Sequence, residues 1–473
     1  MTTSSRSERL EETVFHPLRH TSRAWYVWAG FLAVVVVWGI FAYAVQLRRG
    51  LVETGMRNEV IWGFYITNFV FFIGISHAGT LISAILRVSQ AEWRRPVTRM
   101  AEVITAVALM IGAIMPMVDL GRPDRIPNLI LHGRLGSPVI WDLISITTYL
   151  TGSLIYLYLP MIPDLARCRD MFSGTAHRLR WKLYSVLSLG WQDTKEQRRR
   201  LERGIGVMMI VIIPVAVSVH TVVSWIFSMT MRSGWNSTIF GPYFVVGAIF
   251  SGTAGIITVM AIFRKLFHLE EYITEKQFRN LGLLLLALAA MYFYFTLSEY
   301  LTLAYKEEES EGALMRELML GRYALAFWTF AIGGTIVPAL LLALRPTRTI
   351  PGIVVASVLV NIGMWLKRFV IVVPSLGLPL MPADWAVYRP SWVEISITVA
   401  AFAGFALLFT LFAKLFPIIS VWEVEEGWER ETAGASPAES VPVPVPQVAG
   451  SGPRVPVMPA RLATESLEVE RDA

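Results

Sequence analysis

The sequence is poor in charged residues and in cysteine. Only 16% of its 473 residues are charged, whereas soluble domains carry roughly 25%, which argues against a water-soluble globule. The single cysteine, Cys168, excludes an intramolecular disulfide, a four-thiolate iron–sulfur cluster and a C-x-x-C-H haem attachment within this chain. The basic excess of +6 is not gathered into one long run, so nucleic-acid binding has little support.

Long hydrophobic runs are abundant instead. The chain is 54% hydrophobic with a mean hydropathy of +0.52, and a window of roughly 20 apolar residues, the length of one membrane span, fits ten times. The predicted spans are 25–47, 60–88, 97–120, 139–161, 204–231, 241–264, 280–304, 321–343, 349–373 and 393–418. The first run is too long for a cleaved signal peptide. The sequence therefore predicts an all-α, polytopic membrane protein of about ten transmembrane helices.

Basic residues are distributed unevenly between the two sides of this predicted bundle. The N-terminal arm, residues 1–24, and the segments after spans 2, 4, 6 and 8 hold about 24 lysines and arginines, against about 11 in the other connections. Because basic residues concentrate in cytoplasmic loops, both termini are predicted to be cytoplasmic.

Two segments outside the spans have a distinct composition. Residues 164–203 mix aromatic and basic side chains, which fits either a helix in the headgroup plane or a solvated basic loop. The C-terminal segment, 421–473, turns rich in proline, with VPVPVP at 441–446, and is predicted to be an extended or disordered cytoplasmic tail.

Two aspartates flank one outer connection and are the main candidate site residues. Asp119 ends the third span and Asp142 begins the fourth. Carboxylates there suit a reaction in which protons leave a small amphiphilic substrate, with Arg122 tuning them or holding a substrate oxygen. Tyr149 follows Asp142 by seven residues and shares its helix face. The alternative is that both aspartates cap helices or pair with nearby arginines.

Other ionisable residues lie deeper and are read as candidates because burying them in a membrane is costly. His77, in the middle of span 2, has either a functional role or a role in helix packing. Counted from the predicted outer ends, it lies roughly 9 Å deeper than His220 at about 1.5 Å per residue, so the two are not expected to share a haem. A candidate proton path comprises Glu102, His220, Glu299, Lys367, Arg368 and Glu394. The last three are read alternatively as an ion pair bracing spans 9 and 10.

Three word-like motifs carry a family resemblance. The segment GMRNEVIWGFYITNFVFFIGISHAGTLISAILRV (55–88), DLGRP (119–123) and SPVIWD (137–142) resemble the NrfD/PsrC-like family of membrane quinone-reactive subunits, and within it the ActC subunits of bacterial alternative complex III. The resemblance covers roughly residues 25–420. The family's site is associated with a histidine before LGRP and the aspartate of SPxxWD. In this sequence the aspartate of SPxxWD is Asp142, whereas Asp119 occupies the position of the histidine.

The resemblance implies two four-helix bundles, about 60–231 and 241–373, plus two extra helices. It also implies a quinol-oxidising subunit that binds menaquinol near the outer face, holds no haem or cluster or other metal itself, and is inactive alone. Electrons pass to an adjacent iron–sulfur subunit and on to c-type haem subunits, beside a second NrfD-like membrane subunit in the bacterial inner membrane, and protons are released or translocated. A transporter-like subunit with no quinone site is the alternative.

Overall fold

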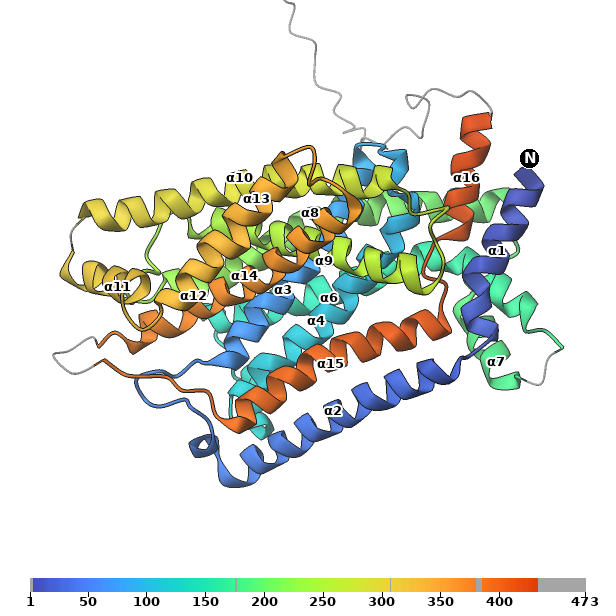
Figure 1. Ribbon diagram of the computed structural model, residues 1–473. Coiled ribbons are helices and arrows are strands. Elements are labelled where there is room, and N and C mark those ends of the chain that lie inside the picture. The colour runs from blue at the N-terminus through green and yellow to red at the C-terminus, as the bar shows by residue number, and fades with distance from the viewer. Residues whose placement is uncertain (1–2, 175–176, 307, 380–384, 433–473) are drawn as a thin grey trace, which may run out of the picture. The chain divides into compact units, whose positions relative to one another are not determined.

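The computed structural model describes residues 3–174, 177–306, 308–379 and 385–432, which form helices with no β-strand among them (Figure 1). Ten helical segments are long and apolar enough to cross a membrane. They are α2 (Arg23–Arg49), α3 (Phe64–Val88), α4 (Arg95–Asp119), α6 (Pro138–Met171), α8 (Lys195–Ser228), α9 (Phe240–Leu266), α10 (Glu275–Lys306), the segment Ala324–Ala343, α14 (Ile350–Gly377) and α15 (Trp392–Leu415). The predicted ten-span, all-α membrane fold is confirmed.

Two of these helices extend far beyond one end of the hydrophobic windows that predicted them. The windows were 139–161 and 204–231, whereas α6 continues to Met171 and α8 begins at Lys195. A capping box starts α8, in which Gln197 N donates to Thr194 Oγ1 at 3.3 Å and Thr194 N donates to Gln197 Oε1 at 3.4 Å. These added turns are polar, so a hydropathy window does not detect them.

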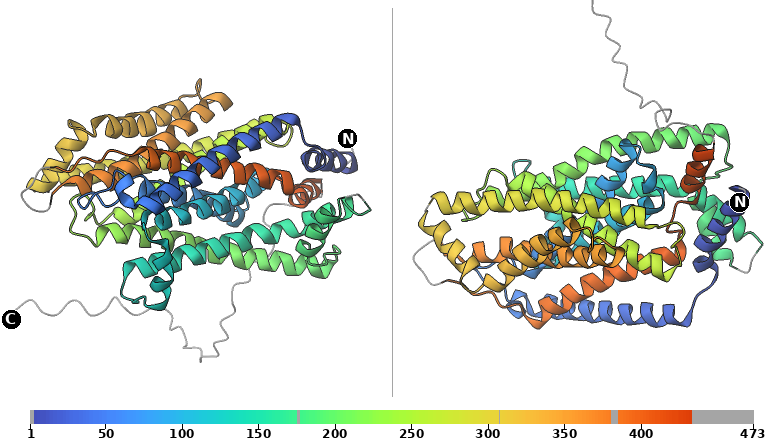
Figure 2. Two further views of the ribbon diagram at one scale, coloured as in Figure 1. Left: turned by 90° about the horizontal axis from the view of Figure 1, so that it is seen from below. Right: turned by 45° about the horizontal axis from the view of Figure 1, so that its top comes forward.

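The spans pack as two groups of four around α3 and α9. The first bundle contains α3, α4, α6 and α8, and the second contains α9, α10, the segment 324–343 and α14 (Figure 2). Helix α3 packs against α9 and α14 and so joins the two bundles. Its apolar window is 87% buried, compared with 22% for α2. Residues on α3 are therefore the ones best shielded from lipid.

The two extra helices, α2 and α15, pair along the side of the first bundle (Figure 1). The pair is close because Gly39 has no side chain: a Cβ atom there would lie 2.1 Å from the Cβ atom of Ala400. Small residues at such crossings are typical of membrane helix packing. This arrangement agrees with the two-bundle expectation.

The eighth span is irregular. It runs from α12 (Ala324–Trp328) through a π-helix (Thr329–Ile336) into α13 (Val337–Ala343). A Cβ atom at Gly334 would lie 2.5 Å from the Cα atom of Gly363 on α14. Single π-helical turns are rare and often occur at functional sites. Here the turn lies beside buried Lys367, four residues after Gly363.

The ends of the bundles differ in composition. At one end, the arginine end, α3 finishes near Arg87, α4 begins at Arg95, and the short helices α1 (Thr3–Arg19), α7 (Arg178–Leu187) and α16 (Val421–Thr432) pack (Figure 1). At the other, the loop end, lie Asp119, the start of α6, and the short helices α5 (Ile126–Leu131) and α11 (Glu309–Met319). Ten crossings bring α16 back to the end where α1 lies.

Three segments at the arginine end contain helices that lie outside the ten spans. The N-terminal arm contains α1, whose Leu10 and Leu18 are buried. Residues 421–432, assigned to the extended tail, form α16 instead, because Val421 and Val424 bury against the bundle. Residues 433–473 lie outside the described residues. The 164–203 segment does contain a helix, α7, and its position relative to the headgroups stays a prediction.

Candidate functional site

One face of α6 carries a polar side chain at each of three levels of the first bundle. Asp142, Tyr149 and Tyr156 are spaced seven residues apart and therefore share a face. They extend over about 21 Å at 1.5 Å per residue. Both tyrosines are fully buried. This stripe links the loop end to the arginine end.

The tyrosines of this stripe meet matching serines on α3. Tyr149 Oη donates to the carbonyl oxygen of Ser76 at 3.1 Å, and Tyr156 Oη lies 3.3 Å from Ser83 Oγ. Ser76 and Ser83 are also seven residues apart, so the two contacts repeat once per two helical turns. The interface between α3 and α6 is therefore polar at its centre and at its arginine end.

The central level contains a buried histidine pair. His77 Nδ1 donates to Ile73 O at 2.7 Å, and its Nε2 contacts Ala216 O and lies 3.1 Å from His220 Nδ1. The ring of Tyr149 lies 4.8 Å from the ring of His77. His220 Nε2 is buried and accepts or donates no hydrogen bond within the described residues. This group can pass a proton between two helices, α3 and α8.

The predicted depth difference between His77 and His220 is wrong. Their ring centroids are 3.9 Å apart, so they lie at one level. Counting residues from helix ends failed although α3 begins later and α8 ends earlier than predicted, at Phe64 and Ser228, because these two shifts nearly cancel. The outer ends of the two helices therefore do not lie at one level, and side-chain reach adds to axial position.

At the loop end, Asp119 and Asp142 each hold a buried Oδ1 atom with no hydrogen-bond partner among the described residues. No described hydrogen bond joins the two side chains. The charge that acts on Asp119 is that of Glu394 on α15. Arg122 forms a bidentate ion pair with Asp124, at 2.9 and 3.0 Å, and both are exposed. The candidate carboxylates are thus unpaired, and Arg122 is engaged elsewhere.

Glu394 is held as a helix cap. Its carboxylate accepts from Tyr388 Oη at 2.5 Å, from Gly55 N at 2.6 Å and from Ser391 N at 2.9 Å. Burial, with the charge of Glu394, raises the pKa of the Tyr388 hydroxyl, so this hydroxyl stays a donor. The predicted ion pair of Glu394 with Lys367 and Arg368 is therefore wrong, because local donors at the start of α15 satisfy its carboxylate.

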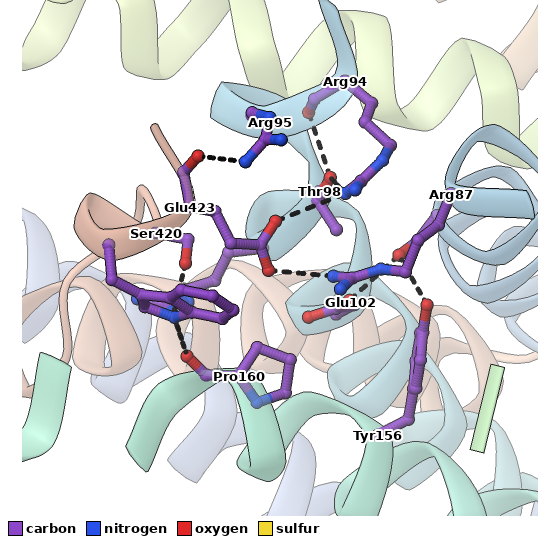
Figure 3. Close-up of polar contacts among 12 residues, drawn as sticks. Arg87, Arg94, Arg95, Thr98, Glu102, Tyr156, Pro160, Ser420 and Glu423 are labelled. Atoms are coloured by element: carbon purple, nitrogen blue, oxygen red, sulfur yellow. Dashed lines mark hydrogen bonds and ion pairs between the residues drawn. The ribbon is translucent and has the colours of Figure 1, made fainter. Parts of the chain in front are cut away.

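Glu102 occupies the arginine-end level of the stripe (Figure 3). Ser83 Oγ donates to Glu102 Oε1 at 2.9 Å, and Ser83 also contacts Tyr156. The second carboxylate oxygen, Oε2, is buried without a partner in the described part of the chain. Glu102 is therefore poised to exchange a proton with a small hydroxyl cluster.

A carboxylate that the sequence analysis did not identify lies beside Glu102. Glu423 on α16 accepts from Arg87 Nη2 at 2.9 Å and from Arg94 Nη1 at 3.3 Å, and Figure 3 shows it between the two guanidinium groups. Burial alone raises its pKa, but the two arginines outweigh burial and lower the pKa of Glu423 to about 2. Glu423 is therefore ionised under all physiological conditions.

A second buried pair fixes the start of α16. Arg99 Nη1 lies 2.5 Å from Asp164 Oδ2, and Arg99 also donates to Pro160 O at 2.7 Å and Ser420 Oγ at 3.0 Å. Asp164 accepts from Val421 N and Trp422 N. Arg99 falls inside a predicted span, which was the available signal for this pair.

The second bundle encloses a lysine in an aromatic cage. Lys367 Nζ donates to Tyr300 Oη at 3.1 Å and lies 5.0–5.1 Å from the rings of Tyr243, Tyr300 and Phe330. Glu299 is its electrostatic partner and keeps Oε2 without a described hydrogen bond. A buried cation that interacts with rings rather than a direct carboxylate is a candidate proton carrier.

Arg368 extends this cluster toward the histidine pair. Its guanidinium lies 5.6 Å from the ring of Phe244, which in turn lies 6.4 Å from the ring of His220. Gly247 makes room for it, because a Cβ atom there would lie 3.1 Å from Arg368 Nη2. Of the predicted proton-path residues, His220 and Arg368 thus both lie near one aromatic ring, that of Phe244.

A cavity of about 410 Å³ lies at the arginine end, among the ends of α6 and α8 and helix α16. Its lining is mostly charged, with Arg167, Arg198 and Glu425 among the residues. Apolar ligands bind in mainly hydrophobic pockets, so this cavity does not suit a quinone ring. Among the described residues, no group of three or more His, Cys, Asp or Glu side chains is placed to hold a metal ion.

Comparisons with known proteins identify relatives along most of the chain. The family model described as polysulphide reductase, NrfD matches residues 52–378. A Halobacterium salinarum protein, named for the membrane subunit of a dimethyl sulfoxide reductase, is 28% identical over 83% of this chain and 91% of its own length. A selenate reductase subunit of Mesobacillus selenatarsenatis is 23% identical, over 82% and 93%. The menaquinone reductase integral membrane subunit of Nitratidesulfovibrio vulgaris is 21% identical, over 83% and 91%.

Proposed function

The chain belongs to the NrfD family of integral membrane subunits, and on that premise we propose that it is the quinol-oxidising subunit of a membrane-bound oxidoreductase complex. Menaquinol is the proposed substrate, since one relative is named as a menaquinone reductase subunit. The electrons pass to an iron–sulfur subunit on the outer face. The chain holds no redox centre in this scheme and is inactive alone.

One observation carries this proposal: two carboxylates at the loop end keep a buried oxygen atom free of any described partner. Asp119 and Asp142 lie at the facing ends of adjacent spans α4 and α6. A quinol loses two protons and two electrons when it becomes a quinone. A carboxylate beside each hydroxyl accepts these protons, and general-base catalysis of this kind contributes typically 10²–10⁴-fold to a rate.

The stripe on α6 assigns roles to the neighbouring residues. Asp142 accepts the first proton, because it is the member of the stripe nearest the loop end. Asp119 occupies the position of the histidine that the family resemblance places before LGRP. Tyr149 and His77 form the inner side of the proposed quinol site, where their rings lie 4.8 Å apart. Arg122 binds a quinone oxygen in this proposal, after its ion pair with Asp124 has broken.

Proton translocation is the second part of the proposal. Glu102, His220, Glu299, Lys367 and Arg368 are buried and form separate groups at three positions across the two bundles. Glu394 belongs to the same candidate path, where its Tyr388 contact supports a fixed, positioning role. Protons released from quinol exit at the loop end and contribute to the membrane gradient.

The finer assignment is to bacterial alternative complex III. The partners in that assembly are the iron–sulfur subunit, a second NrfD-like membrane subunit and c-type haem subunits, in the bacterial inner membrane with both termini cytoplasmic. Exposed apolar side chains along α2, such as Phe31, Val34 and Phe41, support contact with lipid or with the second membrane subunit.

The test is the Asp142→Asn variant of the complex purified from its native membrane. Quinol oxidation is expected to fall by about 10²-fold or more while the complex assembles. Asp170→Asn is the matched control, because Asp170 is an exposed aspartate at the opposite, arginine end of the same helix α6. Turnover near that of the unmodified complex in Asp142→Asn would refute the assigned role. Solute uptake by the chain alone in vesicles would favour the transporter alternative.

A further inference from the structure

Glu102 and Glu423 compete for one arginine. Arg87 follows Ser83 by four residues on α3, so both side chains lie on the helix face that meets Glu102. The Arg87 guanidinium nevertheless binds Glu423 at 2.9 Å, and Glu102 receives only the Ser83 hydroxyl among the described hydrogen bonds. The charge of Arg87 acts on both carboxylates.

We propose that Glu423 is a positioning residue that binds Arg87, keeps its guanidinium off Glu102, and so leaves Glu102 free to take up and release a proton. This inference rests on the proposed proton path. It gives α16 a part in that path, although α16 follows the last membrane span. The step moves one proton onto or off Glu102 and transfers no electron.

Among the charged groups around Glu102, Arg87 is the arginine that Glu423 can hold away from it. The titratable or charged groups that face it are Arg87 from α3, Tyr156 from α6, Glu423 from α16 and Arg99 from the preceding turn of α4. Arg99 is already held by Asp164 in a buried ion pair. Of the two arginines that face Glu102, Arg87 is therefore the one whose partner changes when Glu423 changes.

The other arginines hold Glu423 in place. Arg94 Nη1 donates to the second carboxylate oxygen at 3.3 Å, and Arg95 Nη1 donates to the backbone carbonyl of Glu423. Because two arginines bind its carboxylate and a third binds its backbone carbonyl, Glu423 keeps its geometry when Glu102 gains or loses charge. If Glu423 is neutralised, Arg87 is free to turn toward Glu102 and hold it as a carboxylate by a direct, charge-assisted hydrogen bond.

Infrared difference spectroscopy of the purified complex during quinol turnover tests this inference. The unmodified complex is expected to show a carboxylic-acid band that Glu102→Gln removes. Glu423→Gln is expected to remove the same band, because Glu102 then stays ionised. Glu425→Gln is the matched control: Glu425 lies on the same helix but pairs with Arg167 outside the cluster, and the band should remain.

Further variants separate positioning from a general structural effect. Replacing Arg87 as well, in Arg87→Gln/Glu423→Gln, is expected to restore the band, which no simple loss of structure would do. If Glu423→Gln does not assemble, Glu423→Asp keeps the charge on a shorter side chain and should lose part of the band.

The outcomes that overturn each claim are distinct. A Glu102 band unchanged in Glu423→Gln, or in Glu423→Asp where that variant is used, overturns the positioning role and leaves the proposed function standing. A complex that oxidises quinol with no Glu102 band at all overturns both the inference and the proton path through Glu102.

Discussion

His220 Nδ1 lies 3.1 Å from His77 Nε2, so two helices of the first bundle share a hydrogen bond between imidazole rings in a fully buried position. The contact lies beside Tyr149, on the stripe that begins at Asp142. Histidine is the side chain best suited to give and take a proton near neutral pH. The pair therefore lies on the proposed proton path, one level further into the bundle than the quinol site.

The His77→Gln variant tests the role of this pair. Loss of the ring removes the contact with His220, and we expect quinol turnover to fall by about tenfold or more, since general acid–base groups contribute typically 10²–10⁴-fold. His268→Gln, an exposed histidine, should have no effect. Steady-state quinol oxidation checks the result. Equal activity of the two variants would make the histidine pair a packing feature.

The Lys367→Met variant tests the second bundle separately. Methionine fills the aromatic cage without a charge, so we expect quinol oxidation to continue while fewer protons cross the membrane per quinol. Proton movement in vesicles containing the complex measures this ratio, with exposed Lys265→Met as control. An unchanged ratio would remove Lys367 from the proton path.

The close contact at Gly334 makes a stability prediction. Gly334→Ala places a methyl group against the backbone of Gly363, and overpacking of this kind costs typically 1–3 kcal/mol. The neighbouring Gly333→Ala is the matched control, because its Cβ atom would meet only Thr329 Cγ2, at 3.9 Å. Thermal unfolding of the complex compares them. Similar melting of both variants would contradict the packing described for span 8.

Glu423 makes a prediction about pH. Its pKa is lowered to about 2 in the folded protein, against about 4.3 for an unperturbed glutamate. A lowered pKa contributes stability that is present above the ordinary value and lost as the pH falls toward the folded value. Docking of α16 should therefore be insensitive to pH from 5 to 8 and weaken between about pH 4.5 and 2.

Fluorescence of Trp422 and Trp428 follows this docking. Glu423→Gln should destabilise the docking of α16 by about 3–5 kcal/mol, since it removes the buried ion pairs that join α16 to Arg87 and Arg94. The more exposed pair of Glu425 contributes about 0–1 kcal/mol. Loss of α16 docking near pH 6 would contradict the lowered pKa.

The sequence was sufficient for the spans, whereas the two bundles were expected only from the family resemblance. Each crossing needs a long apolar run, and such a run is visible without any knowledge of tertiary contacts. Asp142 and Tyr149 were also predictable as neighbours, because helical spacing alone puts them on one face. The polar extensions of α6 and α8 were not, since they lie outside the apolar windows.

The long-range contacts could not be predicted from the sequence. Glu423 binds Arg87 across 336 residues of sequence, and nothing near Glu423 distinguishes it from Glu425 or Glu426. The histidine pair was not predicted, because counting residues along each helix takes no account of helix tilt or of side-chain length. Glu394 was predicted to lie on the proton path or, alternatively, in a distant ion pair, although the capping motif begun by Ser391 explains its contacts locally.

The location of the quinol head group tests the account most directly. A photoreactive quinone analogue should be cross-linked in the intact complex and its site found by peptide mass spectrometry. We expect labelling within residues 119–149, around Asp119, Asp142 and Tyr149, with displacement by excess menaquinol. Displaceable labelling confined to the arginine end, near Glu102 and Glu423, would contradict the central claim.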